Sequence, residues 1–121
     1  MTPQEVFDKA VTHLLTQMKK SGMNNENGEF ECLYRGPNGL MCGAGPFIPD
    51  EVYHPSMENV SISGVISDNA KLGHLEPHRR LLADIQSIHD NDRVENWSEN
   101  LADLAKLRQL TFNPPNPEPS T

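Results

Sequence analysis

Residues 32–53, which read CLYRGPNGLMCGAGPFIPDEVY, determine the predicted arrangement of strands. Leading into this stretch, apolar and polar side chains alternate through residues 29–35, a pattern typical of a half-buried strand. Residues 36–40 then have Pro and Gly at the positions that a tight turn favours, and such a turn would send the chain back antiparallel. The stretch therefore predicts a β-hairpin.

The register of this predicted hairpin follows from its turn. Counting outward from the turn places Tyr34 opposite Cys42 and Cys32 opposite Ala44, because directly opposed residues share a face of the ribbon. The face that we expect to be buried then carries Phe30, Cys32, Tyr34, Leu40, Cys42 and Ala44.

The opposite face of the predicted hairpin is the candidate binding surface. It carries Arg35 and Met41 beside two glycines, where a flat ligand or a backbone could approach closely. Tyr53 and His54 follow soon after the second strand and could join them. The predicted ligand- or partner-binding residues are therefore Arg35, Met41, Tyr53 and His54, and the alternative is an ordinary hairpin face that a helix covers.

The N-terminus carries a strong helix-start pattern. Thr2 is followed by Pro3 and, three residues after the cap, by Glu5, which together form a capping box with Pro in the first turn. Apolar residues then recur at helical spacing until Gly22. The pattern predicts a long helix from about Pro3 to Ser21.

Three further helices are predicted after the hairpin. Pro49 precedes two acidic residues, as in the first turn of a short helix, and Pro77 precedes an apolar stripe. Asp92 and Glu95 form a second capping pair before a final helix. The short linker before Asp92 predicts that the last two helices pack antiparallel. Residues 59–73 fit either a third strand or a helical turn.

These elements define an α+β fold in a single small domain, residues 1–111. It consists of a long N-terminal helix, a β-hairpin that a third strand could extend, a short helix and a C-terminal antiparallel helix pair. Residues 112–121 are rich in proline and predict an extended or disordered tail.

Composition narrows the classes of function. The chain has a formal net charge of -7 and 36% hydrophobic residues, enough for a core but unlike the basic surface that nucleic-acid binding needs. No apolar run approaches the ~20 residues of a membrane span, and the N-terminus lacks the apolar core of a signal peptide. We expect a cytoplasmic protein that binds neither membrane nor, directly, nucleic acid.

The two cysteines are expected to be buried thiols. Cys32 and Cys42 have nine residues between them and no histidine pair close beside them, whereas structural zinc sites use pairs separated by two to four residues. The predicted register sets them diagonally, near the limit for a disulfide. The glycines of residues 36–45 lie in the predicted hairpin and do not directly precede a helix. A glycine-rich phosphate-binding loop is therefore not expected. We predict no catalytic residue, no metal and no cofactor.

One longer pattern resembles a known family. The run C-x-Y-R-x-P-x-G-L-x-C-x-x-G-x-x-I-P-D-E-x-Y over residues 32–53, with LADIQSIHD over residues 82–90 and Trp97, is similar to a family of small uncharacterised proteins of phages, prophages and bacteria. The resemblance covers residues from the first helix to about Leu110. It implies a phage-type accessory protein that could interact with a host factor.

The leading functional hypothesis is a non-enzymatic accessory protein that binds and modulates a host protein, with defence proteins as one candidate class. Its acidic surface would speed encounters with basic partners. One alternative is a binder of a small ligand or nucleotide that uses the open hairpin face. The other, which the sequence favours least, is a cysteine-dependent enzyme.

Overall fold

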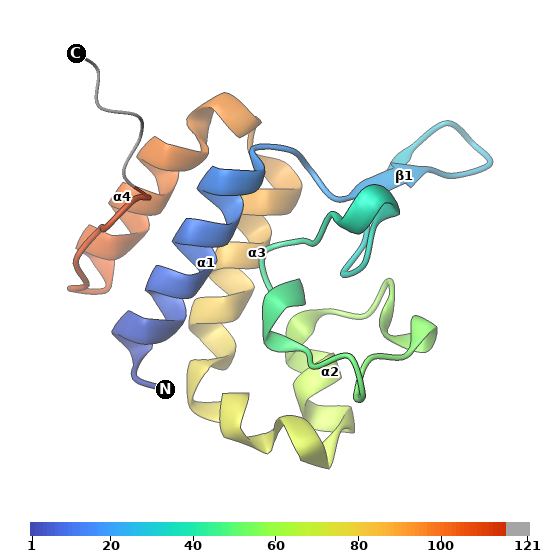
Figure 1. The fold of residues 1–121 in the computed structure, drawn as a ribbon, viewed down its shortest axis with the longest axis horizontal. Helices are drawn as coiled ribbons and strands as arrows, with labels where there is room; N and C mark the ends of the chain where they lie inside the picture. The colour runs from blue at the N-terminus through green and yellow to red at the C-terminus, as the bar shows by residue number, and fades with distance from the viewer. Residues whose placement is uncertain (116–121) are drawn as a thin grey trace.

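The computed structural model describes residues 1–115, which form a cluster of helices with one projecting β-hairpin (Figure 1). The predicted α+β architecture is confirmed: a long N-terminal helix, a two-stranded antiparallel hairpin, short helices and a C-terminal helix pair. The helices that build most of the core are α1 (Pro3–Gln17), α3 (Arg79–Asn91) and α4 (Trp97–Leu107). None of the helices in residues 1–115 has the length and apolar composition needed to cross a lipid bilayer.

Helix α1 begins at the predicted capping box. The Thr2 hydroxyl accepts a hydrogen bond from the Glu5 N–H at 3.1 Å, and the Thr2 N–H donates to the Glu5 carboxylate at 2.7 Å. The predicted end at Ser21 is wrong, because Met18 adopts the left-handed conformation (φ 48°) and its N–H bonds back to the Leu14 carbonyl. Such a cap ends a helix, so the chain leaves α1 four residues earlier than expected.

The C-terminal helices pack antiparallel, as predicted (Figure 1). Arg108, which follows the last residue of α4, bonds the carboxylate of Asp84 in the first half of α3 at 2.6 Å. The predicted cap at Asp92 is wrong, because the Asp92 carboxylate accepts from the side chain of Asn100 at 2.9 Å. A short 3₁₀ turn, η5 (Val94–Asn96), leads into α4 instead. Helix α3 starts at Arg79, two residues after Pro77, and continues a 3₁₀ segment, η4 (Ala70–His78).

The hairpin forms one segment earlier than predicted. Strand β1 (Gly22–Asn24) pairs with β2 (Phe30–Cys32), with Gly22 opposite Cys32 and Asn24 opposite Phe30. Its turn is built locally: the side-chain oxygen of Asn25 accepts from the N–H groups of residues 27 and 29, and Gly28 has φ 79°. An Asx turn with a glycine at positive φ needs no distant partner.

The predicted second strand does not form, because side chains from other elements occupy its backbone donors. The Met41 N–H donates to Gln17 of α1, and the Ala44 N–H donates to Gln86 of α3, both at 3.0 Å. The predicted register of Tyr34 with Cys42 is therefore wrong. The turn at Pro37 exists as η1 (Pro37–Gly39), but no ladder continues from it.

Two helical segments, residues 62–68 and 70–73, occupy most of residues 59–73, and no third strand forms in the part of the chain that the structure describes. Helix α2 (Ile62–Asp68) begins where the Ser61 hydroxyl accepts from the Gly64 N–H at 3.1 Å. The short helix predicted at Pro49 is a single turn, in which the N–H groups of Val52 and Tyr53 both reach the Pro49 carbonyl.

The core lies between α1, α3 and α4 and extends under α2 and the segment after the hairpin. Tyr34, Cys42 and Ala44 are buried as predicted, but Phe30 is not, since 49% of it is exposed. Leu110 and Phe112 also pack against the core, which brings the first residue of the predicted tail into the domain. Most of that predicted tail lies outside the described residues.

Candidate functional site

The first candidate surface is the hairpin, residues 22–32, which we call the acidic hairpin. It extends away from the helices (Figure 1) and presents Met23 and Phe30 with 55% and 49% exposure. Glu26 and Glu29 are exposed beside them and Glu31 is half-buried. No Lys, Arg or His occurs in this stretch. The hairpin therefore presents exposed apolar side chains next to negative charges that no basic residue of the hairpin neutralises.

Two of the four predicted site residues come together. The guanidinium of Arg35 lies over the ring of Tyr53, 4.7 Å from its centre. The same guanidinium donates to the Asp50 carboxylate at 2.6 Å and to the Ile48 carbonyl at 2.7 Å. These contacts use Nη1 and Nη2, while Nε is buried without a partner among residues 1–115. Through them Arg35 holds the loop of residues 48–53 in place.

Glu58 is the centre of this group, and sequence reasoning missed it. Its carboxylate accepts from the N–H groups of Tyr34 and Arg35 at 2.8 and 3.2 Å and from the Tyr53 hydroxyl at 2.6 Å. Burial and the bond to Glu58 raise the pKa of Tyr53 to about 12. No local pattern marks Glu58, because its partners lie up to 24 residues away in the sequence.

The other two predicted residues bond elsewhere. The Met41 backbone is held by Gln17 and by His13, whose Nε2 lies 2.9 Å from the Met41 carbonyl. His54 is exposed and bonds Ser56 within its own turn. Within residues 1–115, no hydrogen bond or ion pair joins either residue to Arg35.

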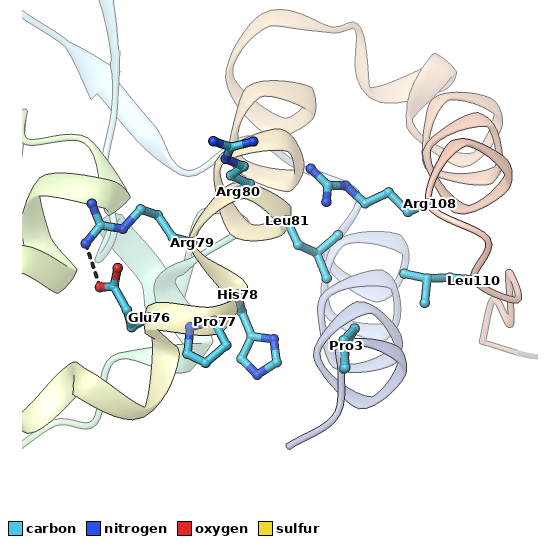
Figure 2. Close-up of a pocket in the computed structure, with 9 residues that line it drawn as sticks. All are labelled: Pro3, Glu76, Pro77, His78, Arg79, Arg80, Leu81, Arg108 and Leu110. Carbon is cyan, nitrogen blue, oxygen red and sulfur yellow. Dashed lines mark hydrogen bonds and ion pairs between the residues drawn. The ribbon is translucent and has the colours of Figure 1, made fainter.

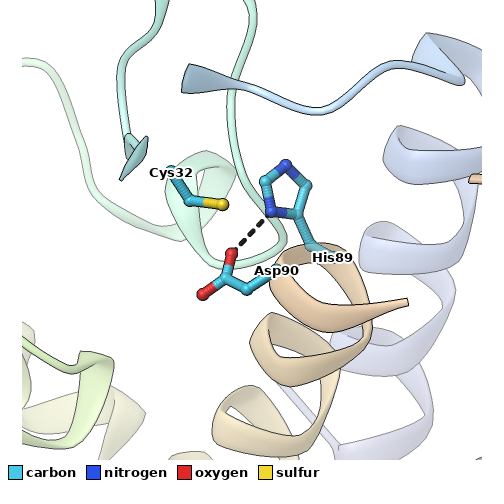
Figure 3. A group of neighbouring side chains, drawn as sticks. All are labelled: Cys32, His89 and Asp90. Atoms are coloured by element: carbon cyan, nitrogen blue, oxygen red, sulfur yellow. Dashed lines mark hydrogen bonds and ion pairs between the residues drawn. The ribbon is translucent and has the colours of Figure 1, made fainter. Parts of the chain in front are cut away.

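A second cluster, Cys32, His89 and Asp90, lies where the base of the hairpin meets the end of α3 (Figure 3). The three potential ligand atoms lie within 4.8 Å of one another. His89 is fully buried, and its Nδ1 lies 2.7 Å from the Asp90 carboxylate. Cys32 and Asp90 also line a cavity of about 370 Å³ that Phe30 borders.

The hydrogen bonds of His89 argue against a metal in this cluster. The Ser21 N–H donates to His89 Nε2 at 2.9 Å, so the ring proton of neutral His89 must sit on Nδ1, which then donates to Asp90. To bind a metal through Nδ1, the ring would move its proton to Nε2, opposite the Ser21 N–H. That exchange would set two donors against each other in a buried site.

The same cluster is poorly suited to nucleophilic catalysis. Burial, and then the nearby Asp90 carboxylate, raise the pKa of the Cys32 thiol to about 12. Burial also raises the pKa of Cys42 to about 12. A reactive cysteine needs a thiolate, which a lowered pKa provides, and both cysteines are unpaired thiols. The cluster is therefore best described as a structural link between the hairpin and α3.

Comparison of the chain with protein-family models, with curated proteins and with solved structures found no match. The function must therefore be argued from the chemistry of the described surface. The chain is a small α+β protein from which the acidic hairpin projects (Figure 1).

Proposed function

We propose that this chain is a non-enzymatic accessory protein that binds a basic host protein through the acidic hairpin. The observation that carries this proposal is the joint exposure of Met23 and Phe30 on a projecting ribbon. Aromatic and Met side chains are enriched at the centres of protein interfaces. The two side chains supply apolar contact area that the rest of the domain does not cover.

Charge determines which partner the hairpin fits. Glu26, Glu29 and Glu31 lie within six residues, and the whole chain carries a net charge of -7. Such a surface speeds association with a positively charged patch and disfavours acidic partners. The partner is therefore a protein whose basic surface surrounds an apolar depression.

The sequence resemblance to small phage, prophage and bacterial proteins supports a partner from the bacterial host, and the binding would modulate that partner's activity. Cys32 and Cys42 are both unpaired thiols, which is the usual state in a reducing compartment. The encounter is accordingly proposed to take place in the host cytoplasm.

The test is affinity capture from bacterial lysate with three forms of the immobilised protein. Wild type should retain one partner in a one-to-one ratio, and Met23→Ser with Phe30→Ser should lose it. Leu107→Ser is the matched control, because Leu107 is 78% exposed but lies at the end of α4. Failure of wild type to retain a stoichiometric partner, or equal retention by the hairpin and control variants, would contradict the proposal.

A further inference from the structure

A third feature, independent of the hairpin, is a cavity of about 540 Å³ between three helix ends (Figure 2). The start of α1 contributes Pro3, the start of α3 contributes residues 79–81, and the segment after α4 contributes Arg108 and Leu110. Its volume falls within the range of roughly 300–1,000 Å³ that is usual for small-molecule sites.

The cavity concentrates positive charge in an acidic protein. Arg79, Arg80 and Arg108 line it, and they are three of the five arginines of the chain. Arginine presents a planar set of N–H donors that matches phosphate and carboxylate groups. In a chain with net charge -7, this grouping makes the cavity a candidate site for an anion.

The three arginines differ in how much of their donor capacity is already used. Arg79 bonds Ser63, Ser67 and, at 2.5 Å, the Glu76 carboxylate. Arg108 donates to the Asp84 carboxylate from Nε at 3.2 Å and from Nη2 at 2.6 Å.

Arg80 keeps all of its side-chain donors, and in the described chain Nη1 of Arg108 is also unused. Arg80 is exposed, and no hydrogen bond or ion pair involves its side chain within residues 1–115. The carboxylates of Glu76 and Asp84 balance the charges of Arg79 and Arg108, so one positive charge is left at the cavity, on Arg80. In Figure 2 the Arg108 side chain extends from the end of α4 toward α3, which carries Arg80.

The remaining walls of the cavity are largely apolar. Pro3, Pro77, Leu81 and Leu110 line it alongside the arginines. A bare inorganic anion would leave these side chains without a contact. An anion with an organic body would cover them and still reach the guanidinium groups.

We propose that this cavity binds a small organic phosphate of about mononucleotide size. Arg80 and the unused Nη1 of Arg108 contact the phosphate, and the apolar walls contact the organic part. Arg79 shapes the site through its bonds to Ser63, Ser67 and Glu76 and is not available for the ligand.

A titration of the ¹⁵N-labelled protein with AMP, followed through its amide resonances, tests this proposal. AMP should produce saturable shifts at residues 77–81 and 108–110 and none in residues 22–32. Adenosine and inorganic phosphate, which each supply one half of the ligand, should bind at least about tenfold more weakly. Absence of saturable shifts at residues 77–81 and 108–110 up to about 10 mM AMP would overturn the proposal, since binding that weak is below about 3 kcal/mol.

Two arginine variants distinguish binding of AMP in this cavity from a general attraction of AMP to positive charge. Arg80→Ala should weaken AMP binding about tenfold or more. Arg93→Ala removes the same charge at the other end of α3, where Arg93 is 81% exposed, and should change the affinity less than about twofold. Equal weakening by both variants would overturn the proposal. Loss of AMP binding would leave the hairpin proposal intact, because no residue is shared between the two surfaces.

Discussion

The half-buried carboxylate of Asp90 links several side chains at the end of α3. Its carboxylate accepts from His89 Nδ1 at 2.7 Å and from the Gln86 side chain at 3.1 and 3.3 Å, and it lies beside the Cys32 thiol. Through these groups one side chain connects α3 to the hairpin. A network of this kind is stable only when every buried member has a partner.

Asp90→Ala should therefore destabilise the fold by about 2 kcal/mol, because it leaves the buried Nδ1–H of His89 without an acceptor. Asp90→Asn keeps one acceptor oxygen and should cost less. The free energy of urea unfolding measures both. A loss below about 0.5 kcal/mol for the alanine variant would show that the network contributes little, as exposed substitutions usually do.

His13 gives the protein a pH-dependent stability. Burial lowers the pKa of His13 in the folded state, whereas an unfolded histidine titrates near pH 6.5. Between these two values the unfolded state binds more protons than the folded state. The contribution of His13 to the free energy of unfolding is therefore fully present above about pH 6.5. It falls as the pH falls toward the folded-state pKa, by at most about 1.4 kcal/mol per pH unit.

The variant His13→Gln isolates this contribution, since glutamine can still donate to the Met41 carbonyl that His13 contacts but does not titrate. We expect its unfolding free energy to change less than that of wild type between pH 7.5 and pH 5.5. Identical changes in the two proteins would assign the pH dependence to other groups.

At the scale of elements, the sequence predicted what local patterns determine. The start of α1 follows from Thr2 and Glu5, which bond within one turn. The hairpin turn has an equally local signal in Asn25 and Gly28. The prediction placed the turn at residues 37–39 instead, because Pro-Asn-Gly there is also a strong turn signal.

The predicted second strand fails to form for a reason that local sequence patterns do not show. Gln17, Glu58 and Gln86 come from three separate parts of the chain and bind the backbone of residues 34–44. These side chains take the donors that a second strand would need, and a side chain's reach across the fold is set by tertiary packing. The predicted site shared this error, because it assumed that Arg35 and Met41 lay on one face of a ribbon.

Gly43 shows how closely this irregular segment packs on α3. A Cβ at Gly43 would lie 2.9 Å from the Ile85 side chain and 3.1 Å from its carbonyl oxygen. Gly43→Ala should therefore destabilise the protein by about 1–3 kcal/mol through overpacking.

Gly73→Ala is the matched control for that prediction. A Cβ at Gly73 would meet nothing within 4 Å, and Gly73 lies in the helical segment η4, where alanine is favoured over glycine. Thermal unfolding should show a lower midpoint for Gly43→Ala and an unchanged or higher one for Gly73→Ala. Equal unfolding midpoints for the two variants would mean that the backbone around Gly43 moves to accept the added methyl group and that its contact with Ile85 is not tight.

As a whole, residues 1–115 consist of a packed helical body and a projecting hairpin (Figure 1). The body buries Trp97, Phe7 and Leu14, whereas the hairpin leaves Met23 and Phe30 in solvent. Periodicity alone assigned Phe30 to the buried face, because alternation identifies one face of a strand without showing what covers it. The exposed apolar pair was therefore visible only in the three-dimensional arrangement.

We propose that the acidic hairpin is the partner-binding surface. The Kd of the captured partner for two variants that change the net charge equally tests this proposal. One variant is Glu26→Lys with Glu29→Lys in the hairpin, and the other is Glu99→Lys with Asp103→Lys on α4, where both acids are exposed. We expect the hairpin variant to bind about tenfold more weakly or worse and the α4 variant to stay within about twofold of wild type. Equal affinities of the two variants would show that the hairpin is not the binding surface.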